Sequence, residues 1–290
     1  MLRVSESETR FAFGENWRSF LSSFDADRVD EATRSLTQLL GRKSLHETTF
    51  LDLGSGSGLF SLAAVGMGAR VVSVDLDEKS VECTRLLRER WMQSDPDADR
   101  SRWEVHAGSV LDLDFMRSLG QFDTVYSWGV LHHTGDMNQA MKFASERVSA
   151  SGLFAIAIYN DQGGGSRRWL RIKQGYHRIP SWMRSPYVLV VAGFHELRFT
   201  LARLAAGRNP LPFSDWAAKR RDRGMSVWHD WVDWVGGLPF EVARPEEIVV
   251  PLRERGFVLN RLYTVGNGWG CNEYVFEKLP MSPSAGHGSS

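Results

Sequence analysis

The alternation of two kinds of segment between Phe50 and Asn160 restricts the fold of this chain more than any other feature. Short runs of apolar, mostly β-branched or aromatic residues predict strands, at 50–54, 69–75, 102–108, 122–128 and 152–160. Longer runs with apolar residues at helical spacing predict helices between them, at 59–68, 78–91 and 137–148. Buried strands separated by helices are typical of a parallel sheet that is covered on both faces. The sequence therefore predicts an α/β fold.

Both ends of the chain and one long internal segment depart from this alternation. Residues 245–256 begin with proline and end with glycine, which predicts a helix. Residues 257–266 and 271–279 predict two strands joined by a glycine-rich hairpin turn. A further helix is predicted at 27–41. Between 161 and 243 the alternation stops, and we expect a helical insertion there, after the fifth strand.

These patterns divide the chain into five parts. We expect an N-terminal helical cap (1–45), a core (46–160), a helical insertion that covers a substrate (161–243), a C-terminal part of the core (244–280) and a disordered tail (281–290).

Composition excludes several classes of protein. The 35 basic and 35 acidic residues cancel, which argues against nucleic acid or an anionic membrane as a partner. Only Cys83 and Cys271 are present, so we expect neither a disulfide framework nor a metal site. The first ten residues lack a signal-peptide pattern, and the longest apolar run, 187–194, is too short to span a bilayer. We expect a cytoplasmic protein, and the sequence indicates no oligomeric state.

The insertion has a composition of its own. Between Asp161 and Gly224, thirteen Lys and Arg face four Asp and Glu. These cations either cover a helical surface in water or attract an anionic substrate. Five of the eleven tryptophans fall between Trp182 and Trp234, where they form a packed core or line a ligand pocket. The sequence leaves both pairs of alternatives open.

The glycine-rich turn in FLDLGSGSGLF (50–60) lies between a predicted strand and a predicted helix, an arrangement that binds anions or nucleotides. Its glycines do not follow the dinucleotide spacing, because Leu59 stands where the third glycine would be. Asp52 would also repel a phosphate. Asp75 ends the next strand, 21 residues after Gly54, and a carboxylate there can accept hydrogen bonds from ribose hydroxyls.

Four segments together resemble the class I S-adenosylmethionine (SAM)-dependent methyltransferases: DLGSGSG (52–58), the acid in VVSVDLD, GSVLDL (108–113) and FDTVYSWGVLHHTGD (122–136). The resemblance runs from Phe50 to Asn160, and the terminal hairpin extends it to Leu279. It implies a seven-stranded Rossmann-like methyltransferase sheet with a terminal antiparallel hairpin, and SAM as the cofactor.

The same resemblance implies ten cofactor contacts. From the methionine end of SAM to its adenine end they are Asp52, Gly54, Ser55, Gly56, Gly58, Trp128, Asp75, Leu76, Ser109 and Val110. Asp52 would hold the amino group, Asp75 the ribose, and Trp128 would lie under the methyl group. Many members of the family have Asp where this chain has Ser109, which puts a side-chain contact to the adenine amino group in doubt.

Four residues are candidates for catalysis on the acceptor. His132 and His133 follow the fourth strand, and an imidazole suits proton removal near neutral pH. Because this histidine pair is common in members of the family with different acceptors, one of the two can also be structural or lie beside SAM. Tyr159 ends the fifth strand, and His229 lies in VWHDWVDWVGG (227–237) beside tryptophans that form either a pocket wall or a packed helix face.

The function favoured by these features is methyl transfer from SAM to an oxygen or nitrogen of a small molecule, whether aromatic, sugar-like or anionic. The basic insertion favours a tRNA or RNA methyltransferase as an alternative, although no RNA-binding appendage is present. A non-catalytic SAM-binding interaction module is a second alternative. Leu59 and Asp52 argue against an NAD-linked oxidoreductase.

Overall fold

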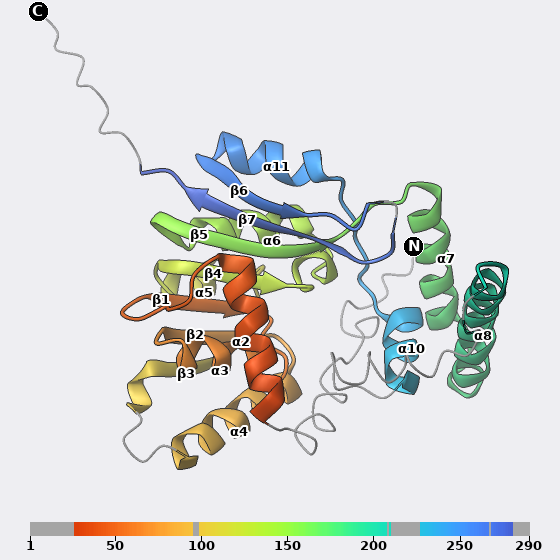
Figure 1. The fold of residues 1–290 in the computed structure, drawn as a ribbon, viewed down its shortest axis with the longest axis horizontal. Helices are drawn as coiled ribbons and strands as arrows, with labels where there is room; N and C mark the ends of the chain where they lie inside the picture. Colours follow the sequence, from red (N-terminus) through yellow and green to blue (C-terminus); the bar gives the residue numbers. More distant parts are fainter. Residues whose placement is uncertain (1–25, 95–98, 208, 210–226, 267, 281–290) are drawn as a thin grey trace, which may run out of the picture.

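A computed structural model describes residues 26–94, 99–207, 209, 227–266 and 268–280 (Figure 1). Its centre is a seven-stranded sheet in the order β3-β2-β1-β4-β5-β7-β6. The strands are β1 (Thr49–Leu53), β2 (Arg70–Asp75), β3 (Trp103–Ala107), β4 (Phe122–Trp128), β5 (Val148–Tyr159), β6 (Phe257–Tyr263) and β7 (Cys271–Lys278). Only β7 runs antiparallel to its neighbours, β5 and β6. The predicted fold class, with its terminal antiparallel hairpin, is confirmed.

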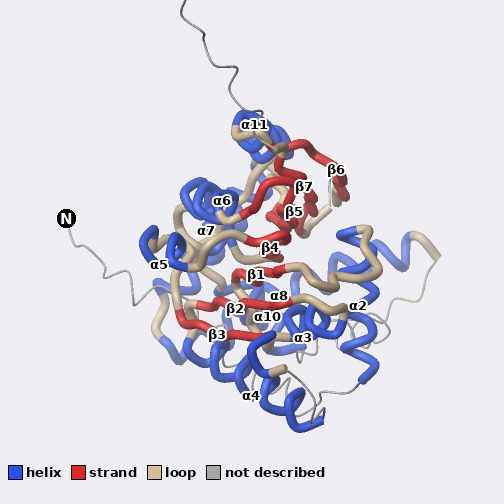
Figure 2. Tube along the Cα trace, turned by 90° about the vertical axis from the view of Figure 1, so that its left-hand side faces the viewer, coloured by secondary structure: helices blue, strands red, loops and turns tan. Residues whose placement is uncertain are grey.

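Helices cover both faces of this sheet (Figures 1 and 2). On one face are α2 (Ala26–Leu40), α3 (Leu59–Gly66) and α4 (Glu78–Ser94), and on the other α5 (Leu113–Ser118), α6 (Met137–Glu146) and α11 (Pro245–Glu254). Successive strand residues point to opposite faces, so that Phe50 packs with the first group and Leu51 with the second. Because both faces are covered, apolar residues occur at both odd and even positions of the strands.

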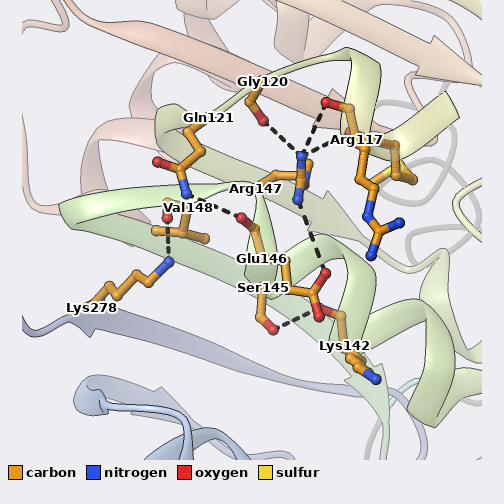
Figure 3. A network of polar contacts seen from close by, with 10 residues as sticks. Arg117, Gly120, Gln121, Lys142, Ser145, Glu146, Arg147, Val148 and Lys278 are labelled. Carbon is orange, nitrogen blue, oxygen red and sulfur yellow. Dashed lines mark hydrogen bonds and ion pairs between the residues drawn. The ribbon is translucent and has the colours of Figure 1, made fainter. Parts of the chain in front are cut away.

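Helix α5 was not predicted from the sequence. It has six residues, too few for a helical period to appear, and Asp112 begins it by accepting the N–H groups of Asp114 and Phe115. Arg147, just before β5, donates to the carbonyls of Met116, Arg117 and Gly120 at the other end of α5 (Figure 3). These bonds fix the amino ends of β4 and β5, the sheet edge opposite the site described below.

The insertion forms α7 (Gly164–Arg178), α8 (Ser181–Ala205) and α10 (Val227–Gly236), which lie beyond the carboxyl ends of the strands (Figure 1). It has its own apolar cluster, around Trp169, Tyr176, Val188 and Val235. Its two ends meet at a parallel bridge between Asn160 and Ala243, where the Ala243 N–H donates to the Tyr159 carbonyl at 2.9 Å. The insertion therefore leaves the sheet and returns to it at one point.

Several expectations fall on residues that are not described. Residues 1–25 of the N-terminal cap, 210–226 of the insertion and the 281–290 tail lie outside the described ranges. Among the helices that are described, none combines the length and apolar composition that a bilayer crossing requires. The described part of the chain also holds no group of three His, Cys, Asp or Glu side chains placed to bind a metal ion.

Candidate functional site

The glycine turn after β1 has a backbone that only glycine adopts at low cost. Gly54, Gly56 and Gly58 have φ angles of 84°, 56° and 80°. The N–H groups of Gly54 and Ser55 both donate to the Val74 carbonyl, at 2.7 and 3.1 Å, which ties the turn to the end of β2. A Cβ atom on Gly54 would lie 2.3 Å from the side chain of Val130. The loop is thus closely packed and held at the carboxyl edge of the sheet.

Asp75, at the tip of β2, joins this loop to the next one. One carboxylate oxygen accepts the Gly56 N–H and the other accepts the Asp77 N–H, both at 2.9 Å. Burial raises the pKa of Asp75, and the backbone hydrogen bonds oppose that shift. A carboxylate has about four acceptor positions, so two hydroxyl donors can still bind it. Leu76, which follows, exposes its side chain.

Asp52 is buried beneath the loop at the end of an ordered chain of hydrogen bonds. The Trp103 indole N–H donates to the Ser73 hydroxyl at 2.8 Å, and the Ser73 and Ser61 hydroxyls are 2.6 Å apart. Because Ser61 donates to Asp52 at 2.6 Å, Ser73 must donate to Ser61. Burial raises the pKa of Asp52 to about 7; the Ser61 bond opposes this shift and the charge of Asp75 adds to it.

The other predicted cofactor residues lie along the same edge. The Ser109 hydroxyl accepts the Leu111 N–H at 3.1 Å, and Val110 packs against the core on the α5 side of the sheet. Trp128, at the end of β4, is partly exposed and donates its indole N–H to Glu273 on β7 at 2.9 Å. Asp52, Asp75 and Trp128 lie at the carboxyl ends of β1, β2 and β4, and the other seven predicted contacts lie on the segments that follow β1, β2 and β3. The role of all ten in binding SAM stays a prediction.

Three of the four catalytic candidates form one aromatic cluster. His132 and His133 both belong to a short 3₁₀ helix, Leu131–His133, and their ring centroids are 4.5 Å apart. The Tyr159 ring lies 4.0 Å from that of His132. His229 is in α10, but its side chain lies outside what the structure describes. Its catalytic role stays a prediction.

Burial keeps both histidines of the cluster neutral. It holds the pKa of His132 well below the ordinary value, and the charges of His133 and Lys173 act in the same direction. It lowers the pKa of His133 to about 4. The Nδ1 atom of His133 lies 2.5 Å from the Pro239 carbonyl oxygen, which can only accept, so Nδ1 carries the proton of the neutral ring. Nε2 is then the basic nitrogen of His133.

A cavity of about 420 Å³ lies between the end of β5, helices α7, α8 and α10, and the turn before β7. Tyr159 and Asn160 belong to its wall, so it lies at the sheet edge that also carries the glycine loop. Six aromatic side chains form much of the rest: Trp169, Phe199, Trp231, Trp234, Phe240 and Trp269. Trp231 and Trp234 thus line a pocket and also join the apolar cluster, whereas Trp182 is exposed and belongs to neither.

The polar part of the cavity wall was missed from the sequence. Lys173 is almost fully buried, donates to the Trp234 carbonyl at 2.7 Å and lies 5.1 Å from the centre of the Phe240 ring. His195 stands edge-on to Trp234 with centroids 4.6 Å apart, and its burial lowers its pKa. The signal for Lys173 was present, because it shares the buried face of α7 with Trp169. No local pattern marks His195, which comes from α8.

Comparison with known proteins shows which protein families have sequences similar to this chain. A family model described as "Methyltransferase domain" matches residues 51–156. The ubiquinone biosynthesis O-methyltransferase of Paramagnetospirillum magneticum is 27% identical over 179 residues, which are 62% of this chain and 59% of that protein. The ribosomal protein L11 methyltransferase of Pelobacter propionicus is 46% identical over 61 residues, 19% of this chain and 20% of that protein. This chain therefore spans less than two thirds of the length of these relatives.

A solved structure agrees with the fold over nearly the whole chain. An O-methyltransferase family protein from Burkholderia thailandensis superposes with a TM-score of 0.50 at 14% identity, covering 96% of this chain and 66% of that one. The matching domain includes the glycine loop, Asp75 and the strand before the histidine pair. Residues 51–156 of this chain therefore match a methyltransferase domain, and the strand order agrees with the fold that the sequence resemblance implied.

Proposed function

We propose that this protein transfers a methyl group from SAM to an oxygen or nitrogen atom of a small planar acceptor that carries an acidic group. The observation that supports this most is the aromatic cavity at the carboxyl edge of the sheet, whose volume lies within the range of small-molecule sites. The Trp169 and Trp234 rings, 4.0 Å apart, offer flat apolar surfaces, and the Lys173 ammonium lines the same space.

The residues around the glycine loop fit the chemistry of SAM. The Asp75 carboxylate suits a pair of ribose hydroxyls, and the exposed Leu76 side chain suits an adenine ring. Asp52 has a pKa of about 7, so a cationic amino group held near it would favour its ionised form. When bound, SAM supplies a methyl group on a sulfonium, which is electrophilic without further activation.

We assign the proton-accepting role to His133 and a positioning role to His132. The Pro239 carbonyl fixes the His133 tautomer and leaves Nε2 as the basic nitrogen. With a pKa of about 4, this nitrogen would accept the proton after methyl transfer has made the acceptor's oxygen or nitrogen positively charged and acidic. His132 is fully buried, and its carbonyl accepts the Glu241 N–H at 2.9 Å. Its ring packs directly on Tyr159, which belongs to the cavity wall. Substitution of His132 should therefore act through Tyr159.

Two measurements test this proposal. S-adenosylhomocysteine, the demethylated form of the cofactor, should raise the thermal midpoint of the purified protein, whereas NAD should not. Radiolabelled SAM should then transfer label to some member of a panel of small phenolic and amino-substituted aromatic acids. Label entering bulk tRNA, with an affinity that falls steeply as salt rises, would favour the RNA alternative instead.

Lys173 gives a sharper test of the acceptor class. Lys173→Met should raise KM for an acidic acceptor at least tenfold and leave the affinity for S-adenosylhomocysteine unchanged. Lys142→Met, which removes an exposed lysine of α6, is the matched control and should leave both constants at wild-type values. Equal KM values in the two variants would contradict the proposed acidic group without touching the cofactor assignment.

A further inference from the structure

The outer face of α8 is apolar and exposed along the whole helix. Its large side chains recur at helical spacing, and two of them, Trp182 and Val190, are 75% and 72% exposed. The others on this face are Leu189, Leu197, Leu201 and Leu204, each more than half exposed. The four charged residues of α8 fall at other positions, and only Val188 and Ala192 are buried. α8 lies at the rim of the molecule, so nothing described covers this face (Figure 1).

An exposed face of this extent is uncommon in a monomer. A helix of 25 residues is about 37 Å long. The apolar patches of ordinary monomers cover a few hundred Å², and a stable dimer buries about 800 Å² on each partner. The opposite face of α8 carries Ala192, His195 and Phe199 of the cavity wall, so the helix cannot turn its apolar face inward. Among the described residues, this face therefore has no cover.

Gly193 lies in the middle of the exposed face. Nothing lies within 4 Å of the position that its Cβ atom would take. A glycine inside a helix lowers helix stability by about 1 kcal/mol relative to alanine, and no contact within the described chain accounts for it. Close approach of a second helix backbone at this position would account for it.

We propose that two copies of this protein pair through the outer faces of their α8 helices, which run antiparallel and cross at Gly193. Positions equally far from Gly193 on its two sides then lie opposite each other. Trp182 comes to lie opposite Leu204, and Leu189 opposite Leu197. Because the same face serves both copies, the contact is closed and two-fold symmetric.

The charges of α8 favour an antiparallel pair over a parallel one. Arg184, Arg198 and Arg203 would lie at the level of Ala202, Val188 and Met183 of the other copy. Glu196 would lie at the level of Val190, so no like charges meet. In a parallel pair, each arginine would lie beside the same arginine of the other copy. A lipid surface is the other apolar cover to consider. Helices that lie on membranes carry many basic residues beside the apolar face, whereas α8 has three arginines and one glutamate. A fluid surface would also give no reason for Gly193.

The first test is the mass of the purified full chain in solution, measured by light scattering at micromolar concentration. The wild type should have twice the mass of one chain. Val190→Glu combined with Leu197→Glu should halve it, with an unchanged far-ultraviolet circular dichroism spectrum. Val250→Glu, at an exposed valine of α11, is the matched control and should remain dimeric. A monomeric wild type would overturn the proposal.

The second test locates the axis. Gly193→Cys should form a disulfide-linked dimer on mild oxidation, because the two cysteines would meet at the axis, while Val250→Cys should not. The native Cys83 is buried and Cys271 is partly buried, so the wild type measures how much disulfide forms through the native cysteines.

A third test, sedimentation with phosphatidylglycerol vesicles, distinguishes a lipid surface from a second copy. A monomer that binds these vesicles and loses binding on Val190→Glu with Leu197→Glu would identify a lipid surface as the cover and refute the pairing.

Discussion

At the scale of single residues, Gly54 allows the loop after β1 to pack closely against Val130 because it has no side chain. Gly54→Ala should lower the free energy of unfolding by about 2–4 kcal/mol, because the new methyl group would collide with Val130 at a positive φ of 84°. Chemical denaturation measures this. Gly120→Ala is the matched control, since Gly120 has a φ of 82° and open space around it, and should cost only about 1 kcal/mol.

A second substitution separates the collision with Val130 from the backbone strain at a positive φ. Val130→Ala in the Gly54→Ala background should restore part of the stability, because it removes the atoms that come within 2.6 Å of the new methyl group. A double variant no more stable than Gly54→Ala would show that backbone strain alone causes the loss.

Asp52 and His133 should give pH dependences of opposite sign. The pKa of Asp52 is raised from 3.8 to about 7, so the folded protein binds the extra proton and Asp52 reduces stability as pH rises from about 4 to 7. The pKa of His133 is lowered from 6.5 to about 4, so the unfolded chain binds the extra proton and His133 reduces stability as pH falls over a similar range.

Difference measurements isolate each group. Relative to wild type, Asp52→Asn should make the slope of unfolding free energy against pH more positive by up to ~1.4 kcal/mol per pH unit, and His133→Gln should make it more negative by a similar amount. Urea unfolding at several pH values between 4 and 7 measures both. A slope change of the same sign in the two variants would contradict the assigned burial of one of them.

At the scale of elements, Glu241 joins the returning end of the insertion to α6. Its carboxylate accepts the N–H of Met137 at 3.1 Å and of Gly135 at 3.2 Å, and so caps the helix from a distant part of the chain. Glu241→Ala should destabilise the protein by about 1 kcal/mol and speed hydrogen exchange at the first turn of α6. Glu246→Ala, at an exposed position of α11, should change neither; unchanged exchange at Met137 in Glu241→Ala would disprove the cap.

Elements differ in how far the sequence predicts them, for physical reasons. The second half of β5, residues 153–159, is a continuous apolar run because both of its faces are buried, and such a run is recognisable in the sequence whatever its neighbours are. Helix α5 is too short to show a period, and its N-cap Asp112 was the only local signal. Helix α8 is apolar on both its cavity face and its outer face, so no single stripe marks its orientation.

The same limit applies to the candidate site. The glycine loop, Asp75 and the histidine pair are contiguous motifs, and the sequence predicts them at one sheet edge because parallel strands share a carboxyl end. The cavity joins Lys173 of α7, His195 of α8 and Trp269 of the turn before β7. These residues meet only through tertiary packing, which no local pattern encodes.

At the scale of the whole molecule, the insertion should be removable. Replacing residues 162–242 by a short glycine–serine linker should leave a folded sheet that still binds S-adenosylhomocysteine, because the replaced segment starts and ends beside the Asn160–Ala243 bridge. Calorimetry of this variant measures binding, and transfer to any acceptor should be lost. Failure to fold would show that the sheet depends on the insertion, for example through the contact of Glu241 with α6.

The meeting of the insertion's two ends at Asn160 and Ala243 also has an evolutionary consequence. A segment that departs from and rejoins its scaffold at a single junction can be exchanged by recombination without disturbing the register of the strands. Descendants of such a chain could acquire a different insertion at this junction, while the sheet and its glycine loop are inherited unchanged.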